Sequence, residues 1–204
     1  MQKKILSKNL VYFITFFFLL SCSSIPKHPA DACKIFGERY LWYKNAKKSS
    51  EMYGAPIHII LAFVKKESGF NRWAKPKRKK LFKVIPYKRP SSSYGYSQAV
   101  EKTWELYKQE TNNPLALRTH FKDSVMFIGW YIKKTNTINQ IPFNDSYRQY
   151  LNYYLGWGSY AKKTYKTDKK SIIYAKSVEK QSKIYKNQLN ECKKILDRKK
   201  YIIF

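Results

Sequence analysis

The sequence predicts a mainly α-helical protein with one folded domain, and three observations support this prediction. Apolar residues recur at the helical spacing of three and four in several long segments. We find no convincing segment with the period of two that a half-buried strand requires, and no internal repeat. The 204 residues suffice for one domain with its own core, and a hydrophobic content of 44% excludes a disordered chain.

Helices are expected in six segments. Pro56 suits the first turn of the second segment, and Gly156-Trp157-Gly158 ends the fifth. In order, the segments are 31–48, with a stripe of Cys33, Phe36, Tyr40 and Tyr43; 55–68, with Ile60, Phe63 and Val64; 98–110; 120–134, with Ser124, Ile128 and Tyr131; 144–160; and 169–197, a long amphipathic helix with Tyr174, Val178, Tyr185, Leu189 and Cys192 on one face.

Residues 75–93 are expected to form a long loop. Three prolines interrupt this stretch, and Pro cannot continue a regular helix or a central strand. The segment is also strongly basic and contains no acid. Its cations are Lys75, Lys77, Arg78, Lys79, Lys80, Lys83, Lys88 and Arg89.

The N-terminus has the pattern of an export signal. A basic start with three lysines precedes an apolar run at residues 10–20, which is too short to span a bilayer as a helix but fits the core of a signal peptide. The next residues, Leu-Leu-Ser-Cys at 19–22, resemble the bacterial lipobox, whose Cys is acylated and becomes the mature N-terminus. The resemblance implies a lipoprotein signal peptide at 1–21 and an acylated tether at 22–30. The alternative is an ordinary buried Cys22 near an N-terminal anchor.

The net charge of +28 indicates an anionic partner or environment. An exported protein does not meet the chromosome, so we expect no nucleic-acid partner. The lipid anchor would tie the protein to a membrane, on the periplasmic face of the cell envelope. By resemblance to other lipoproteins, Ser23 implies sorting to the outer membrane. The alternative is that the charge is solvated surface and reflects a genome with biased codon use.

Two cysteines remain if Cys22 is acylated. Cys33 and Cys192 both lie on apolar helical stripes, and an oxidising compartment favours a disulfide between them. That bond would tie the first helix to the last and stabilise the fold by about 5 kcal/mol. The alternative is two buried free thiols. The three histidines are scattered along the chain, and we expect no metal and no cofactor.

Glu67 is the candidate for chemistry. It shares the apolar stripe of segment 55–68 at position i+7 from Ile60, and Gly69 is a natural helix C-cap directly after it. Burial and the negative end of the helix dipole both disfavour the ionised carboxylate and raise its pKa. A general acid that works near neutral pH needs such a shift. The alternative is a carboxylate paired with one of the many lysines.

Three motifs in order resemble a known family. Residues 67–71, Glu-Ser-Gly-Phe-Asn, resemble the E-S-x-F signature of the soluble-lytic-transglycosylase (SLT) domain, within the lysozyme-like superfamily. Residues 94–99, Tyr-Gly-Tyr-Ser-Gln-Ala, resemble its G-L-M-Q motif, and 151–158 resemble its A-Y-N-A-G segment, with Tyr154 in place of the usual Asn. The resemblance covers about residues 50–165. It implies a lysozyme-like helical domain with a groove at 31–200, in a lipoprotein branch of the family.

The resemblance also implies roles for individual residues. Glu67 would protonate the glycosidic oxygen and then act as a base, and Ser68 would form a hydrogen bond near it. Tyr96 and Gln98 would line the sugar groove, and Tyr153 would stand beside the carboxylate. The alternatives are that Gln98 only starts a helix and that Tyr153 only fills the core.

The implied activity is cleavage of the MurNAc–GlcNAc β-1,4 bond of peptidoglycan. Most glycosidases use two carboxylates, but Glu101 and Glu105 lie on a solvated helix face, and Asp123 is expected to tie down a helix. The family route needs a single Glu, because the substrate's 2-acetamido group assists and its 6-hydroxyl attacks to leave a 1,6-anhydro end. The alternatives are a hydrolytic lysozyme and a non-catalytic peptidoglycan-binding lipoprotein. The basic loop is expected to hold the anionic wall near the groove.

Overall fold

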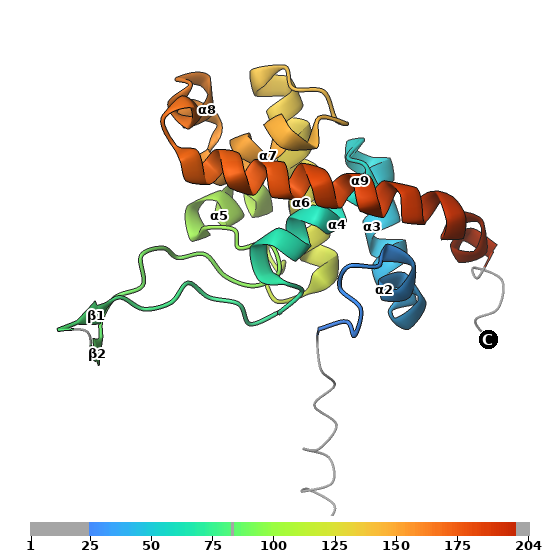
Figure 1. The fold of residues 1–204 in the computed structure, drawn as a ribbon, viewed down its shortest axis with the longest axis horizontal. Coiled ribbons are helices and arrows are strands. Elements are labelled where there is room, and N and C mark those ends of the chain that lie inside the picture. The colour runs from blue at the N-terminus through green and yellow to red at the C-terminus, as the bar shows by residue number, and fades with distance from the viewer. Residues whose placement is uncertain (1–24, 83, 199–204) are drawn as a thin grey trace, which may run out of the picture.

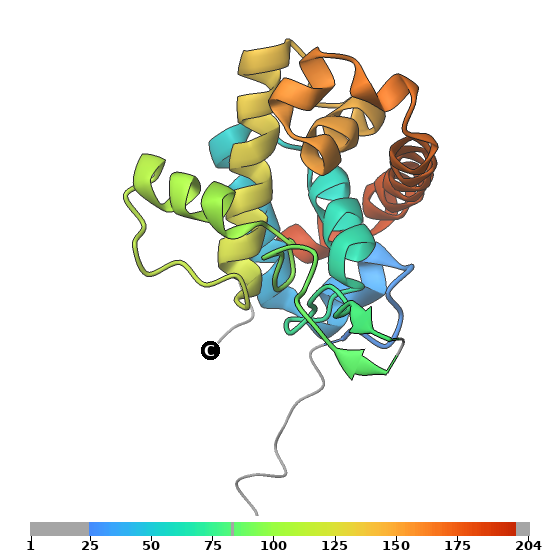
Figure 2. The same cartoon turned by 90° about the vertical axis from the view of Figure 1, so that its left-hand side faces the viewer.

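Helix α4, Ile57–Ser68, lies in the middle of the fold with other helices packed around it. The computed structural model describes residues 25–82 and 84–198, so the expected signal peptide and Cys22 lie outside the described residues. In Figure 2, α4 lies between α6, Phe121–Asn139, and the long α9, Lys169–Arg198. Six consecutive residues of α4, from Ile59 to Val64, are buried. A helix that is apolar on all sides must be enclosed by its neighbours, and the mainly helical prediction is confirmed.

The segment expected as one helix at 31–48 forms two. These are α2, Ala32–Glu38, and α3, Tyr40–Tyr53, and the chain turns at Arg39, where φ is −134° and ψ is 67°. The break allows α2 to pack on α9 while α3 packs along α6. Helix α3 also continues beyond the expected end, to a left-handed Gly54 with φ of 75°.

The remaining helices differ from the predictions mainly at their ends. The segment predicted at 98–110 starts three residues late, because Gln98 has a left-handed backbone with φ of 49°. The segment predicted at 120–134 continues to Asn139, and the segment at 144–160 is divided at Gly156. The helix predicted at 169–197 is confirmed as α9. The observed elements are α5, Glu101–Glu110; α6, Phe121–Asn139; α7, Ser146–Leu155; α8, Trp157–Ala161; η1, Thr164–Lys166; and α9, Lys169–Arg198.

The basic loop contains a short β-hairpin. Strand β1, Lys80–Leu81, pairs antiparallel with β2, Ile85–Pro86, so the expectation of no strands is wrong for this segment. Strands of two residues are too short to show a period of two in the sequence. Figure 1 shows the hairpin projecting away from the helices. No helix of the described residues is both long enough and apolar enough to cross a membrane.

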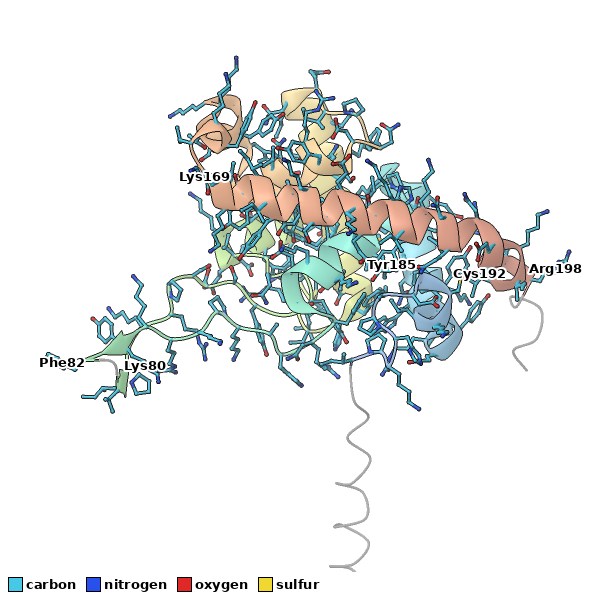
Figure 3. The ribbon with its side chains drawn as sticks, viewed as in Figure 1. Lys80, Phe82, Lys169, Tyr185, Cys192 and Arg198 are labelled. Atoms are coloured by element: carbon cyan, nitrogen blue, oxygen red, sulfur yellow. A yellow bond between two sulfur atoms is a disulfide. The ribbon has the colours of Figure 1, made fainter. Side chains whose placement is uncertain are left out.

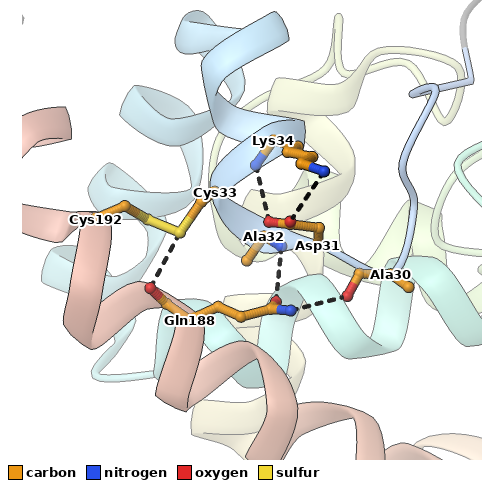
Figure 4. Close-up of a disulfide and its surroundings, with 7 residues drawn as sticks. All are labelled: Ala30, Asp31, Ala32, Cys33, Lys34, Gln188 and Cys192. Carbon is orange, nitrogen blue, oxygen red and sulfur yellow. Dashed lines mark hydrogen bonds and ion pairs between the residues drawn. A yellow bond between two sulfur atoms is a disulfide. The ribbon is translucent and has the colours of Figure 1, made fainter.

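The predicted disulfide is confirmed. Cys33 and Cys192 are bonded, with Cα atoms 5.9 Å apart, and the bond joins α2 to α9 (Figure 4). Gln188 supports the same junction, because its side chain accepts a hydrogen bond from the Ala32 N–H at 2.9 Å and donates to the Ala30 carbonyl at 3.3 Å. The bond closes a loop of 159 residues, so it restricts the unfolded chain strongly.

Candidate active site

The end of α4 places Glu67 at the edge of the core. Gly69 follows it with φ of 56° and donates its N–H to the Lys65 carbonyl at 3.0 Å, which confirms the expected C-cap. The carboxylate therefore lies in the last helical turn, one turn beyond the buried Phe63 and Val64. Glu67 is only partly buried, because one side of it faces a cavity.

The cavity has a volume of about 370 Å³, and Glu67 is the only acid among its described lining residues. One wall is the loop from Ser91 into the start of α5. A second wall is α6, through Phe127 and Tyr131. The third is the end of α7 with Gly156. The cavity thus combines aromatic faces with hydroxyl and amide groups, a composition that suits an amphipathic ligand such as a sugar.

The electrostatic surroundings of Glu67 favour its protonated form. Burial raises the pKa of the carboxyl from 4.5 to about 7. Two contacts oppose this shift by stabilising the charge: the Tyr150 hydroxyl, which donates to Glu67 Oε1 at 2.7 Å, and the positive charge of Lys66. Lys66 itself lies over the Tyr174 ring, 3.6 Å from the centroid. Near neutral pH, both protonation states of Glu67 are therefore populated, as a residue that is first an acid and then a base requires.

Tyr150 is a site residue that the sequence reasoning missed. Its ring packs edge-on against Phe63 with centroids 5.2 Å apart, which holds its hydroxyl at the carboxylate. Burial and the charge of Glu67 raise the pKa of Tyr150 far above its usual value, so it remains a donor. Tyr150 precedes Tyr153 by three residues, so both lie on the same helix face. That spacing marks Tyr150 as a second candidate beside Tyr153, but it does not show which of the two contacts Glu67.

Tyr153 shares the cavity with Glu67, but its hydroxyl has a different partner. It donates to the Ser97 carbonyl at 2.6 Å, and its ring packs edge-on against Phe63 and Tyr131. Burial, followed by the charge of Glu67, raises its pKa well above the usual range. Tyr153 thus links α7 to the loop of the second motif.

Gln98 lines the cavity in a strained backbone conformation. Its side-chain amide donates to the carbonyls of Ala74 and Gly95 at 2.9 and 2.8 Å, which orients the side chain. Gly95 has φ of 74°, and a Cβ there would lie 1.9 Å from the Arg118 carbonyl oxygen, so only Gly fits. Helix α5 begins at Glu101, so Gln98 is not the helix start that was its alternative interpretation.

Ser68 and Tyr96 do not line this cavity. The Ser68 hydroxyl donates to the Val64 carbonyl of its own helix at 3.1 Å. Tyr96 is buried and packs edge-on against Trp42 and Phe121, with centroids 5.6 and 5.5 Å apart. Its backbone N–H donates to Arg118, so the turn at the second motif directs this ring into the core. Tyr96 is therefore placed in the core beside the second motif and not among the residues that line this cavity.

Three hydroxyl residues in the cavity wall were also missed. Ser91 and Ser93 are joined by a hydrogen bond of 2.7 Å, and Thr103 lies in the first turn of α5. The three consecutive serines at 91–93 are the sequence feature that could have indicated these groups, but the sequence analysis assigned them only to the end of the loop at 75–93. Among the described residues, no three His, Cys, Asp or Glu side chains gather closely enough to hold a metal ion.

Comparison with known proteins identifies the family. The family model described as the transglycosylase SLT domain matches residues 10–192. No curated protein and no solved structure gives a significant match. Because the family match spans most of the chain, and the cavity with Glu67 lies within it, this protein belongs to the transglycosylase SLT domain family, whose function is of the lytic transglycosylase type on peptidoglycan.

Proposed function

We propose that the protein is a membrane-anchored lytic transglycosylase that cleaves the MurNAc–GlcNAc β-1,4 bond and leaves 1,6-anhydro-MurNAc ends. The observation that carries this proposal is a lone carboxyl group, Glu67, in an aromatic and hydroxyl-lined cavity, with a pKa of about 7. No second acid among the described residues lines the cavity, so a route with two protein carboxylates has no partner there.

In the proposed reaction, Glu67 first donates a proton to the leaving group and then accepts a different proton from the sugar. The protonated carboxyl donates to the glycosidic oxygen as the bond to C1 of MurNAc breaks, and the 2-acetamido group of the sugar stabilises the positive charge at C1. The carboxylate then removes the proton from the 6-hydroxyl of the same sugar, and that oxygen bonds to C1. Glu67 ends protonated, and no water is consumed.

The neighbours of Glu67 position this chemistry. The Tyr150 hydroxyl holds Oε1, which leaves Oε2 free to face the glycosidic oxygen. Gln98, Ser91 and Ser93 supply hydrogen-bonding groups for sugar hydroxyls, and Tyr153 supplies an aromatic face. Ser68 is proposed to support the helix end next to Glu67, since its hydroxyl binds the helix backbone.

The membrane anchor is proposed to be a lipid on Cys22, on the strength of the lipobox pattern that precedes it. The same pattern, with Ser23, supports placement on the periplasmic face of the outer membrane. Replacement of Cys22 with Ala should release the protein from membranes or block its processing. Fractionation of cells that produce each form measures this, and unchanged processing with unchanged membrane association contradicts the anchor.

The product distinguishes the proposed activity from its rivals. Purified peptidoglycan is incubated with the protein, and the released fragments are analysed by mass spectrometry. Anhydro ends, one water lighter than reducing ends, are expected. Reducing ends alone would identify a hydrolytic lysozyme. Binding without release, over a range of pH and wall sources, would favour a non-catalytic binding protein.

A further inference from the structure

The β1–β2 hairpin is the most prominent feature outside the cavity. It projects from the helical body on two extended segments, and Lys80 and Phe82 lie at its far end (Figure 1, Figure 3). Backbone hydrogen bonds between Lys79 and Lys88, and between Tyr87 and Lys79, hold the two segments together. The six residues 75–80 span at most about 20 Å when fully extended. The tip can therefore contact a surface that the helices do not touch.

Apolar residues are exposed at the tip of the hairpin and next to it. Phe82 is 83% exposed and Val84 is 75% exposed, and Ile85 and Tyr87 are also exposed. Hairpin turns normally contain Gly, Asn or Asp, because these residues tolerate a positive φ. Here Phe82 has φ of 50°, a strained conformation for a bulky aromatic residue. An aromatic group held outward at such a cost indicates a contact that compensates for it.

The segment that carries the hairpin is cationic. Residues 75–89 contain eight Lys and Arg and no acid. None of the described cations of this segment forms an ion pair; instead, Arg89 donates to the Pro76 carbonyl and Lys88 lies over the Tyr87 ring. Their charge is therefore available to an anionic partner. Exposed apolar side chains flanked by cations match the depth profile of an anionic lipid surface, which has phosphates outside and acyl chains inside.

The geometry points to the β1–β2 hairpin as a membrane-docking finger that inserts Phe82 and Val84 into an anionic lipid surface while the flanking lysines and arginines bind its phosphates. A wall polymer offers anionic groups but no apolar interior to receive the tip. The described chain also begins on the same side of the molecule as the hairpin in both views (Figure 1, Figure 2), so an N-terminal attachment and the hairpin can reach one membrane. This inference does not depend on the proposed activity.

The test measures the hairpin directly. The full chain is reconstituted in vesicles of phosphatidylglycerol mixed with phosphatidylcholine, in vesicles of phosphatidylcholine alone, and in detergent. Hydrogen–deuterium exchange of residues 78–90 is followed by mass spectrometry. The readout is local, so it does not depend on how the rest of the chain is attached. Exchange is expected to slow by more than about tenfold in the anionic vesicles and to remain unchanged in the neutral vesicles and in detergent. The reason is that each cation near an anionic surface adds about fivefold in affinity.

Variants separate the tip from the charges. Phe82→Ser with Val84→Ser should abolish the protection, and so should the exchange of Lys77, Arg78, Lys79 and Lys80 for Gln. The matched control is Leu115→Ser with Leu117→Ser, which removes two exposed apolar residues from another loop and should retain the protection. Thermal unfolding temperatures equal to that of the parent would show that each of these variants is folded.

Three results would overturn the inference. These are equal exchange in anionic vesicles and detergent, equal protection by anionic and neutral vesicles, and protection by lipid-free sacculi in place of vesicles. The last result would assign the hairpin to the wall polymer, as the charge of the loop alone suggested.

Discussion

Two carboxylates of this protein accept a hydrogen bond from a tyrosine, yet their pKa values move in opposite directions. Tyr150 donates to Glu67 at 2.7 Å, and Tyr43 donates to Asp197 at 2.8 Å. Burial raises the pKa of Glu67 to about 7. For Asp197, a hydrogen bond from Lys47, 2.6 Å away, lowers the pKa below its usual value.

The difference lies in the surroundings and not in the tyrosine. Glu67 lies at the edge of the core and forms no salt bridge among the described residues, so the loss of hydration dominates. Asp197 lies near the surface at the end of α9, where Lys47 from α3 compensates its charge. One carboxyl group is thus prepared to exchange a proton at neutral pH, and the other remains ionised and links two helices.

The largest expected effect is on catalysis. Glu67→Gln preserves the shape of the side chain and removes the titratable proton, so sacculus cleavage should fall by about 10²–10⁴-fold. Turbidity loss of purified sacculi measures the rate. The variant should remain folded and still bind peptidoglycan.

The controls for that experiment are Glu101→Gln and Glu105→Gln, which change exposed acids on α5. Their activity should remain within a few-fold of the parent, because neither residue lines the cavity. Parent-like cleavage by folded Glu67→Gln would rule out this residue as the acid.

The second expected effect of Glu67→Gln is on stability, which should increase although activity falls. The pKa of Glu67 is about 7 when folded and near 4.5 when unfolded, so the folded chain binds the proton more tightly. Stability from this group is therefore highest below pH 4.5 and falls as pH rises through 7. Glu67→Gln removes that loss and should stabilise the protein at pH 8 by at most about 3 kcal/mol.

Denaturant unfolding of parent and variant at pH 4 and pH 8 measures this. The stability difference should be larger at pH 8 than at pH 4. A difference that is constant with pH would show that Glu67 titrates alike in the folded and unfolded chains.

The third effect concerns the tyrosines. The hydrogen bond from Tyr150 lowers the pKa of Glu67, so Tyr150→Phe should raise it. Because the acid must be protonated, the fall of kcat/KM at alkaline pH should move to higher pH. The lost hydrogen bond should also reduce the rate, on the order of tenfold.

The matched control is Tyr43→Phe, which removes the same hydroxyl group from Asp197 and should leave the pH profile unchanged. Identical profiles for parent and Tyr150→Phe would contradict the role of this contact.

The smallest effect is expected at Asp197. Its pKa is lowered in the folded chain, so its contribution to stability is present above the unfolded pKa and is lost as pH falls. The pair with Lys47 is more than a third exposed on both sides, and solvent screens it. Asp197→Asn should therefore cost no more than about 1 kcal/mol at pH 7 and leave cleavage unchanged. Thermal unfolding measures this, and a much larger loss would show that the pair is a major support of α9.

The sequence alone determined the features that depend on local pattern. Helical periodicity placed α4 and α9, and Gly69 after the apolar stripe located Glu67 in the last turn of its helix. Two cysteines on apolar stripes, together with an export signal that indicates an oxidising compartment, predicted the disulfide. These features follow from spacing along one segment, because a helix fixes which residues share a face.

Only the tertiary structure decided which groups from different segments meet. Tyr150 reaches Glu67 across 83 residues of sequence, and nothing in the local pattern separates it from Tyr153. Tyr96 enters the core because its turn is held against Arg118, far along the chain. The hairpin tip likewise remains outside because no helix covers it. Contacts of this kind depend on how helices pack, and packing is set by the whole core and not by any one segment.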